Sequence, residues 1–323
     1  MVEALLEVRN LKKYFQTAKG KLHAVDNISF SIEPGKTLGL VGESGCGKST
    51  TGRVVLRLLE ATQGAVYFEG NDILKYDKRQ MRKLRREMQI IFQDPFSSLD
   101  PRMTVSQIIE QPLQIHRVFT SKRETQARVS ELMDTVGLSE RYYNAYPHEL
   151  DGGRRQRIGI ARALALNPKF IVCDEPVSAL DVSIQAQILN LMQDLQESFG
   201  LTYLFITHDL SVVRHISDDI AVMYLGQLVE KAPAKELFQQ PLHPYTQGLL
   251  SAIPVPSLRH RRERIILKGE ISSPIDPSPG CRFAKRCIYA TEACLSNDIK
   301  LTEVNPRHSV ACILAQESQM SPA

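Results

Sequence analysis

The sequence has no tryptophan, few cysteines and no long apolar run. Six cysteines among 323 residues are too few for a disulfide scaffold. No window comes near the roughly 18 consecutive apolar residues of a membrane-spanning helix, so we predict that the chain does not cross a membrane by itself. The first fifteen residues mix charged and apolar side chains, which does not fit a secretory signal peptide. Any role at a membrane is therefore expected to depend on a partner.

The net charge of the chain is also modest. Forty Lys and Arg residues against 36 Asp and Glu residues give a net charge of +4 and an isoelectric point of about 8.7. Because a nucleic-acid-binding domain usually carries a larger basic excess, we expect no nucleic-acid partner. Hydrophobic residues make up 43% and charged residues 24% of the chain, which is typical of a globular protein.

Apolar strand-like runs alternate with helix-like segments, and this alternation predicts an α/β fold. The strand-like runs are residues 5–8, 28–32, 37–41, 88–92, 170–173 and 202–206. The helix-like segments are residues 49–59, 124–136 and 184–199, and Gly200 is a plausible cap for the last of them. Strand signals fade between residues 95 and 168, so we predict an inserted helical subdomain there.

A Pro-rich stretch at residues 254–256 and a basic run at residues 259–264 mark a predicted domain boundary. We assign residues 1–255 to a main domain, with its helical subdomain at about 95–168. Residues 256–323 then form a Cys- and Pro-rich C-terminal extension. The chain shows no internal repeat, so we expect one main domain and not two.

A glycine-rich loop connects the strand-like run 37–41 to the helix-like segment that follows it. Backbone N–H groups of such a loop turn toward phosphate oxygens, and the helix N-terminus adds its dipole. Lys48 is expected to reach the β- and γ-phosphates, and the Ser49 hydroxyl to bind Mg²⁺. We interpret Cys46 as a packing residue and not as a reactive thiol. The loop fits the phosphate-binding pattern G-x-x-x-x-G-K-[ST] with Gly42, Glu43, Ser44, Gly45, Cys46, Gly47, Lys48, Ser49 and Thr50.

Two carboxylates follow the strand-like run 170–173. In phosphate-loop enzymes an aspartate at this position helps to hold Mg²⁺, which is the role predicted for Asp174. A second carboxylate beside it can polarise the attacking water as a general base, which is the role predicted for Glu175. An acidic pair alone is explained equally well by exposure to solvent, but the phosphate loop favours the catalytic interpretation.

Four further motifs complete a set. Leu-Asp-Gly-Gly-Arg-Arg-Gln-Arg at residues 150–157 precedes the acidic pair, and Ser-Ala-Leu-Asp at residues 178–181 follows it. Gln93 and His208 each follow a strand-like run. The set and its order resemble the ATPases of ABC transporters, over residues 5–250 or so. The resemblance implies ATP as the nucleotide, and a RecA-like P-loop NTPase core with an antiparallel β subdomain.

The resemblance also implies roles for single residues. Gln93 is similar to a glutamine that touches Mg²⁺ or water and senses the membrane subunit. His208 is similar to the switch histidine, which contacts the γ-phosphate as part of the catalytic machinery. Asp181 is similar to an aspartate at the dimer interface. Tyr14, which lies 28 residues before the first glycine of the loop, is similar to the aromatic residue that stacks on adenine, and Phe15 is the alternative.

Gly152 and Gly153 belong to the signature loop, which in this family meets the γ-phosphate bound by the opposite subunit. The loop has Asp151 where serine is usual and Arg154 where glutamine is usual. An ionised Asp151 cannot donate a hydrogen bond to a phosphate and would repel it, unless Arg154 or another cation compensates. A weakly hydrolysing partner within a heterodimer is therefore an alternative. Hydrolysis is still the leading prediction, because the chain's own catalytic residues are present.

Four cysteines lie in the C-terminal extension: Cys281, Cys287, Cys294 and Cys312. Four thiols in a cytosolic tail favour a metal site over disulfides, although these gaps are wider than the usual zinc spacing. Residues 243–246 and 279–283 resemble the tail of the oligopeptide/dipeptide (and nickel) branch of ABC importers, which in some members carries an iron–sulfur cluster. We predict a [4Fe–4S] cluster, and free structural thiols or zinc are the alternatives.

These patterns predict the ATP-hydrolysing subunit of an ABC importer, with di- or oligopeptides as the expected cargo. The implied partners are a second ABC ATPase subunit, alike or different, two transmembrane permease subunits and, indirectly, an extracytoplasmic substrate-binding protein. The expected location is the cytoplasmic face of the cell membrane, as a peripheral protein. A soluble ABC ATPase of DNA repair or translation is a weaker alternative, because the chain has no sustained heptads and no second nucleotide domain.

Overall fold

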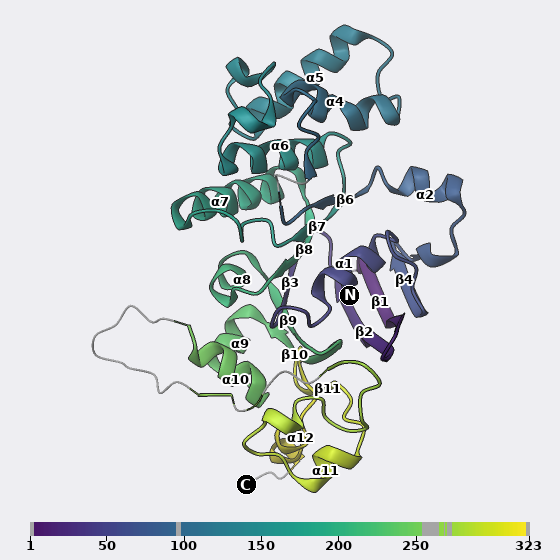
Figure 1. Ribbon diagram of the computed structural model, residues 1–323, viewed down its shortest axis with the longest axis vertical. Helices are drawn as coiled ribbons and strands as arrows, with labels where there is room; N and C mark the ends of the chain where they lie inside the picture. The colour runs from purple at the N-terminus through teal and green to yellow at the C-terminus, as the bar shows by residue number, and fades with distance from the viewer. Residues whose placement is uncertain (1–2, 95–97, 254–264, 268, 270–272, 321–323) are drawn as a thin grey trace. The chain divides into compact units, whose positions relative to one another are not determined.

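The computed structural model describes residues 3–94, 98–253, 265–267, 269 and 273–320 (Figure 1). The predicted domain boundary, with its Pro-rich and basic stretches at 254–264, lies outside these residues. Internal contacts divide the chain into two compact units. Unit 1 comprises residues 1–32, 37–74 and 207–323, and unit 2 comprises residues 33–36 and 75–206.

The first sheet of unit 1 is antiparallel. Leu6 pairs with Ile32 on one neighbouring strand and with Phe68 on the other. Leu6 and Val8 are buried whereas Arg9 is exposed, as expected for a sheet that is covered on one face. This sheet confirms the predicted antiparallel β subdomain. In spatial order its strands are β2 (Gly20–Ile32), β1 (Leu6–Thr17), β4 (Gln63–Phe68) and β5 (Asn71–Asp72).

The second sheet of unit 1 joins strands that are far apart in the sequence. β3 and β9 run parallel, with Leu38 opposite Asp219, and every residue of β3 is buried. β10 and β12 run antiparallel, with Glu230 opposite Val310, so the C-terminal extension contributes strands to the main domain. In spatial order the strands are β11 (Thr302–Asn305), β12 (His308–Val310), β10 (Gln227–Pro233), β9 (Asp219–Tyr224) and β3 (Thr37–Val41).

The helices of unit 1 lie between these strands or after them in the sequence. The phosphate-loop helix is α1 (Lys48–Val55). The others are α8 (Leu210–Ile216), α9 (Ala234–Gln239), α10 (Pro244–Ser251), α11 (Glu292–Ser296) and α12 (Ile313–Met320). Short 3₁₀ turns lie at Ile73–Lys75 and Ala284–Arg286, and two further ones, Glu140–Tyr142 and Pro147–Glu149, belong to unit 2.

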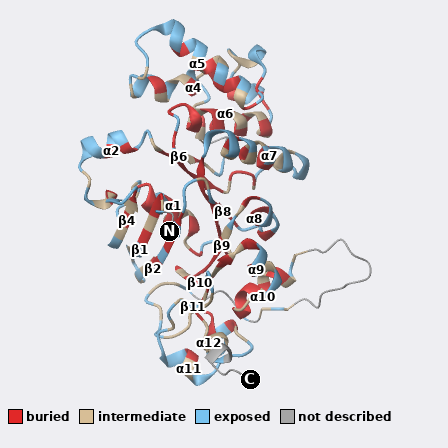
Figure 2. Cartoon of the chain, turned by 180° about the vertical axis from the view of Figure 1, so that it is seen from behind, coloured by how far each residue is buried: buried red, intermediate tan, exposed pale blue. Residues whose placement is uncertain are grey.

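Unit 2 contains three parallel strands, in the order β8 (Thr202–Thr207), β7 (Phe170–Asp174) and β6 (Met88–Ile91). Phe170 lies opposite Met88 on one side and Thr202 on the other. All residues of β7 and β8 are buried, and Figure 2 shows the buried class following the strands. Continuous burial is typical of parallel strands that are covered on both faces.

The helices of unit 2 are α2 (Lys78–Leu84), α4 (Val105–Ile115), α5 (Lys122–Thr135), α6 (Gly152–Leu164) and α7 (Val182–Phe199). Helices α4, α5 and α6 contact one another, and Ile109, Val129 and Ile158 are buried on them. They lie in the part of the sequence where strand signals fade. Helix α7 ends at Gly200, which has the left-handed conformation of a C-cap. No helix of the described residues has both the length and the hydropathy needed to cross a membrane.

The observed elements confirm the predicted α/β fold class. The strand predicted at residues 37–41 coincides with β3, and that predicted at 170–173 continues to Asp174. The sequence pattern did not predict β4, the hairpin of β9 and β10, or the strands of the C-terminal extension. Their pairing depends on partners distant in the sequence, which local periodicity does not reveal.

Candidate nucleotide site

The predicted phosphate loop runs from the end of β3 to the start of α1. Gly42 and Gly47 have φ angles of 154° and 108°, which side chains rarely tolerate. A Cβ atom added at Gly42 would lie 2.1 Å from the Met223 carbonyl oxygen, and one at Gly47 would lie 2.0 Å from the Ala24 carbonyl oxygen. Both positions therefore require glycine, for backbone conformation and for space.

The Lys48 ammonium lies inside this loop. Lys48 is 4% exposed, and its Nζ donates hydrogen bonds to the carbonyl oxygens of Gly42, at 2.8 Å, and Glu43, at 3.0 Å. Ser49 and Thr50 occupy the first turn of α1 and are half-buried. The N-terminal turn of this helix has N–H groups without partners in the helix itself, and it favours anions. The loop thus presents a cation and a helix N-terminus at one place.

Cys46 is buried within the loop, and burial raises the pKa of its thiol. Its carbonyl oxygen accepts a hydrogen bond from Gly226 N at 2.8 Å. A buried, protonated thiol is a poor nucleophile. The geometry is consistent with the packing role that the sequence predicts for Cys46.

Tyr14 lies in β1 and is held on its hydroxyl and on its ring. Its hydroxyl donates to Asp26, and its ring stacks on that of His23 with centroids 4.0 Å apart. Burial and the bond to Asp26 raise the pKa of Tyr14. Asp26 N also donates to Gly226 O at 2.8 Å, so the turn between β9 and β10 connects Tyr14 to the phosphate loop. These two predicted parts of the site are therefore linked within unit 1.

His208 is the first residue after β8 and is exposed. The next residue, Asp209, caps α8 by accepting a hydrogen bond from Ser211 N at 2.7 Å. This cap fixes the start of the helix directly after His208. His208 therefore lies on a short connection between two regular elements.

Unit 2 contains the two predicted catalytic carboxylates. Asp174 ends β7 and is 1% exposed, whereas Glu175 is half-buried. Glu175 has a φ angle of 47°, in the left-handed region that residues other than glycine rarely occupy. Its N–H donates to Ile206 O at 2.9 Å, and its carbonyl oxygen accepts from Ser178 Oγ at 3.1 Å. Backbone strain of this kind clusters at active sites.

The structure brings together Gln93 and Glu175, which the sequence predicts separately. Gln93 Nε2 donates a hydrogen bond to Glu175 Oε2 at 3.1 Å. The two residues follow the adjacent parallel strands β6 and β7, so both lie near the carboxyl ends of these strands. Ligands of α/β proteins usually bind at this edge of the sheet.

The signature loop leads into α6, and Asp151 is the N-cap of this helix. The Asp151 carboxylate accepts a hydrogen bond from Arg154 N at 2.8 Å and also pairs with the Arg154 guanidinium. The two departures from the family pattern are therefore neighbours of opposite charge. Gly153 lies close to α7, because an added Cβ would be 2.7 Å from Ile184 Cγ2. Asp181 is the N-cap residue of α7 and forms no side-chain cap bond.

The four cysteines of the C-terminal extension lie near one another. Cys281 N donates to Cys294 O at 2.7 Å. Burial, and to a smaller extent the three other thiols, raise the pKa of Cys281 to about 11. Within the described part of the chain, however, no group of three or more His, Cys, Asp or Glu residues is placed to hold a metal ion. The four thiols lie near one another, but they are not arranged to hold a single metal ion.

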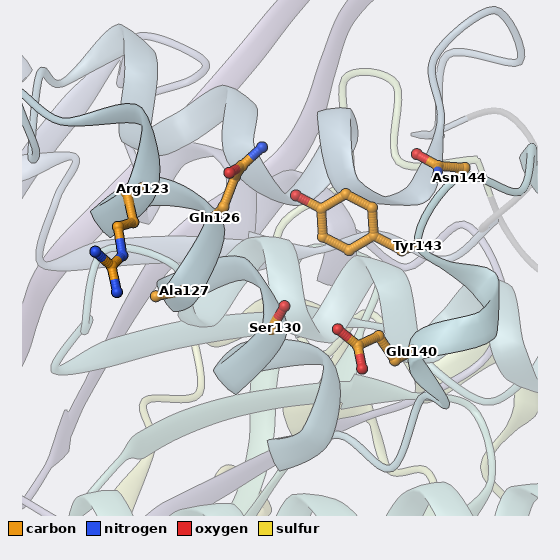
Figure 3. Close-up of a pocket in the computed structure, with 7 residues that line it drawn as sticks. All are labelled: Arg123, Gln126, Ala127, Ser130, Glu140, Tyr143 and Asn144. Atoms are coloured by element: carbon orange, nitrogen blue, oxygen red, sulfur yellow. The ribbon is translucent and has the colours of Figure 1, made fainter.

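A separate hollow of about 550 Å³ lies in unit 2 (Figure 3). Helix α5 contributes one side, and Glu140, Tyr143 and Asn144 contribute the other. None of the predicted site residues lines this hollow. The residues that line the hollow belong to the helical part of unit 2 and precede the two carboxylates after β7 in the sequence. We therefore do not assign the nucleotide site to this hollow.

Comparison with known families gives two matches. Residues 25–178 match the family model described as ABC transporter, and residues 229–294 match that described as oligopeptide/dipeptide transporter, C-terminal region. The chain is 53% identical to the oligopeptide transport ATP-binding protein AppF of Bacillus subtilis, over 97% of this chain and 98% of that protein. It is 52% identical to the oligopeptide transport ATP-binding protein OppF of the same species, over 98% of each.

Solved structures give a consistent result. The chain is 31% identical to the ATP-binding cassette MJ0796, solved as a dimer in a post-hydrolysis state bound to ADP and Pi, with a TM-score of 0.65. That match covers 71% of this chain and 98% of the other. For cbiO1 of Clostridium perfringens, part of the transporter complex cbiONQ, the identity is 28% and the TM-score is 0.66, over 74% and 92% of the chains. These likenesses confirm the predicted P-loop NTPase fold.

Proposed function

Since the chain belongs to the ABC transporter family, in its branch of oligopeptide transport ATP-binding proteins, we propose that it powers the import of di- and oligopeptides by hydrolysing ATP. The observation that carries this function is 53% identity to such a protein along 97% of the chain. The enzyme converts ATP and water to ADP and phosphate and couples this reaction to transport. Its substrates are ATP and water, and Mg²⁺ is its metal cofactor.

We propose that the phosphate loop, residues 42–50, holds the nucleotide phosphates, with Lys48 as the cation that meets them and Tyr14 stacked on adenine. The buried ammonium, the helix N-terminus behind it and the two required glycines support this assignment. His208 is proposed to contact the γ-phosphate. Together these residues bind the triphosphate and set the direction in which its terminal phosphate is presented.

Ser49, Gln93 and Asp174 are proposed to hold Mg²⁺. Their hydroxyl, amide and carboxylate oxygens are the ligand types that this ion prefers, and the buried carboxylate of Asp174 fits a cation site. When bound, Mg²⁺ would neutralise charge on the phosphate oxygens. Glu175 is proposed to accept the proton of the attacking water, and Gln93 positions its carboxylate through the hydrogen bond between them.

Replacement of Glu175 by glutamine tests this assignment. Loss of the base should lower ATP turnover by at least about a hundredfold, in the range of general-base catalysis, while ATP stays bound. Turnover and retained nucleotide are measured on the assembled transporter, and the unmodified protein is the control. Undiminished turnover would show that Glu175 is not the base.

We propose that the working enzyme is a dimer with a second ABC ATPase, alike or different, in which Gly152, Gly153 and Asp181 face the other subunit's nucleotide. Two transmembrane permease subunits complete the transporter at the cytoplasmic face of the membrane, and an extracytoplasmic binding protein delivers the peptide. The oligopeptide transport that the names of the relatives print, and the dimer in which the similar cassette MJ0796 was solved, support this arrangement. Co-purification from membranes tests it, since recovery of nucleic acid or ribosomes instead would contradict a transport role.

A weakly hydrolysing subunit of a heterodimer is the second candidate function, and Asp151 is the observation that favours it. Its carboxylate replaces a hydroxyl that could donate to the γ-phosphate. The Arg154 guanidinium beside it offsets this charge, which supports the leading proposal. We propose domain limits of 1–255, with the helical subdomain at about 95–168, and 256–323; the match to the C-terminal-region model begins at residue 229, inside the first of these domains.

For the extension we propose a [4Fe–4S] cluster on Cys281, Cys287, Cys294 and Cys312. The proximity of the four thiols supports it. Free structural thiols and zinc are the alternatives. An absorption spectrum of the anaerobically purified full chain is the test. A visible band that disappears in Cys287→Ser supports the cluster, and a colourless protein contradicts it.

A further inference from the structure

One segment of the C-terminal extension, residues 281–287, contacts the predicted nucleotide site at two points. Arg286 forms a bidentate ion pair with Glu43, the second residue of the phosphate loop, with N–O distances of 2.7 and 3.1 Å. The Arg286 side chain is 8% exposed and that of Glu43 is 25% exposed. Partial burial weakens solvent screening, so this pair is stronger than a typical surface ion pair.

Glu43 is held at its side chain and at its backbone. Its N–H donates to the Tyr245 hydroxyl at 2.9 Å, and its carbonyl oxygen accepts from Lys48 Nζ at 3.0 Å. Its carboxylate accepts both bonds from Arg286. The start of the phosphate loop is therefore fixed by Lys48 from within the loop and by the extension and α10 from outside it.

The second contact is made by Arg282. Its guanidinium donates to the Asp26 carboxylate, which also accepts from the Tyr14 hydroxyl, and to Leu225 O. Leu225 precedes Gly226, whose N–H donates to Cys46 O in the phosphate loop. Phe283, between the two arginines, is buried against the rings of Tyr224 and Tyr245, at centroid distances of 5.3 and 5.4 Å. The segment is thus anchored by packing as well as by charge.

We propose that Arg286 is a positioning residue of the nucleotide site, which neutralises Glu43 and so sets the affinity for nucleoside triphosphate. The inference rests on the function proposed above for residues 42–50. A triphosphate with several negative charges binds a loop that has its own carboxylate, and like charges at close range oppose binding. Arg286 removes that repulsion and also orders the loop before the ligand arrives, which lowers the cost of binding. Arg282 supports it by fixing the turn behind the loop.

The test is the dissociation constant of the full-length protein for AMP-PNP with Mg²⁺. Arg286→Met should weaken binding about tenfold, the scale of one lost charge interaction. Arg286→Lys, which keeps the charge but not the bidentate geometry, should lose about threefold. Glu43→Gln with Arg286→Met removes both charges and should recover the part of the affinity that repulsion had cost, to within about threefold of the unmodified protein. In the assembled transporter, Arg286→Met should raise KM for ATP and leave kcat unchanged.

Arg307→Met is the matched control. Arg307 also belongs to the extension and pairs with a residue of the main domain, Asp219, at 2.9 Å. That pair does not involve the phosphate loop, so its loss should leave AMP-PNP affinity unchanged. An equal loss in Arg307→Met and Arg286→Met would show a general effect of the extension and overturn the inference.

Lys48→Ala separates the inference from the function on which it rests. If Lys48→Ala still binds AMP-PNP normally, residues 42–50 are not the phosphate loop and the proposed function fails. If Lys48→Ala loses binding while Arg286→Met binds normally, only the inference fails. Should Arg286→Met not fold, Arg286→Lys decides, because it keeps the charge, loses the bidentate geometry and should weaken binding about threefold. Unchanged AMP-PNP affinity in Arg286→Lys would then overturn the inference.

Discussion

At the scale of single residues, charges near the predicted phosphate-binding groups have partners of opposite sign. Glu43 in the phosphate loop pairs with Arg286, and Asp151 in the signature loop pairs with Arg154. A carboxylate close to a phosphate opposes binding, whereas a paired carboxylate acts largely as a structural group. The Asp151–Arg154 pair is more exposed to solvent than the Glu43–Arg286 pair, and its two residues lie within one helical turn.

The Asp151–Arg154 pair leads to a prediction about hydrolysis. Arg154→Ala leaves the Asp151 charge without its guanidinium and should lower the ATPase rate by up to about fivefold, because an exposed ion pair is screened by solvent and contributes up to about 1 kcal/mol. Asp151→Ser with Arg154→Gln, which recreates the usual family residues, should change the rate by less than about threefold. Serine keeps the N-cap of α6, so the helix stays intact.

The ATPase rates are measured on the assembled transporter, and thermal unfolding checks that each variant folds. A gain of more than about tenfold in Asp151→Ser alone would contradict the compensation by Arg154. It would support the alternative of a weakly hydrolysing subunit.

At the scale of helices and strands, the ends of elements position the site. Helix α6 begins at the signature glycines, α7 begins just after Asp181, and α10 begins just after His243. Backbone groups at helix ends have no partners within the helix, so they depend on caps and on close neighbours. Changes at these ends therefore test the packing of an element directly.

Gly153→Ala should destabilise the contact between α6 and α7. The added Cβ would lie 2.7 Å from Ile184 Cγ2, and relieving this overlap should cost about 1–3 kcal/mol of unfolding free energy. Gly159→Ala in the same helix is the control, because no atom lies within 4 Å of its added Cβ. The control should stabilise the protein by about 0.5–1 kcal/mol. Chemical denaturation measures both, and equal effects of the two variants would contradict this account of the packing.

His243 gives the fold a dependence on pH. Its ring is 1% exposed and its Nδ1 accepts the N–H of Tyr245, and burial lowers its pKa to about 4. As pH falls from about 6.5 toward 4, the unfolded chain takes up a proton at this residue and the folded protein does not, so stability is lost. The loss from this group should reach about 2 kcal/mol at pH 5.

His243→Asn retains an N-cap acceptor but cannot titrate. Between pH 7 and pH 5, its unfolding free energy should therefore fall by about 2 kcal/mol less than that of the unmodified protein. Denaturation curves at the two pH values measure this difference. Identical pH dependence in the two proteins would show that folding does not lower the pKa of His243.

At the scale of the whole molecule, the C-terminal extension is part of unit 1 and not an appendage. Its strand β12 pairs with β10, and His308 Nε2 lies 2.8 Å from the fully buried carboxylate of Glu230. Phe283 packs on aromatic rings of β9 and α10. The extension therefore covers apolar and charged groups that water would otherwise reach.

A chain that ends at residue 267 should lose much of its stability. It lacks His308, which is one of the partners of Glu230, and the Phe283 cover of Tyr224 and Tyr245, and we expect its melting temperature to fall by about 10 °C or more. A chain that ends at residue 312 lacks only α12 and the residues after it, and it should melt within a few degrees of the full-length protein. Equal melting temperatures for all three chains would show that the extension is independent of unit 1.

The sequence by itself determined those features of the protein that depend on short runs of consecutive residues. The phosphate loop, the acidic pair at the end of β7 and the signature glycines are short patterns whose chemistry follows from residue type and spacing. They predicted a phosphate and Mg²⁺ site and, through the family resemblance, ATP as the nucleotide and the coupling to peptide import, while the alternation of strand-like and helix-like runs predicted the fold class. Burial of β3, β7 and β8 was equally local, because it follows from uninterrupted apolar runs.

Only the tertiary structure decided which residues, distant in the sequence, contact those motifs. The left-handed backbone of Glu175, its bond to Gln93, and the hold of Arg286 on Glu43 involve groups that local periodicity cannot connect. Arg286 and Glu43 are separated by 243 positions, and their attraction operates only after β10, β12 and the aromatic core around Phe283 have assembled. Residue type fixes what a side chain can do, but electrostatic and hydrogen-bonding effects depend on distance in space, which the folded chain alone supplies.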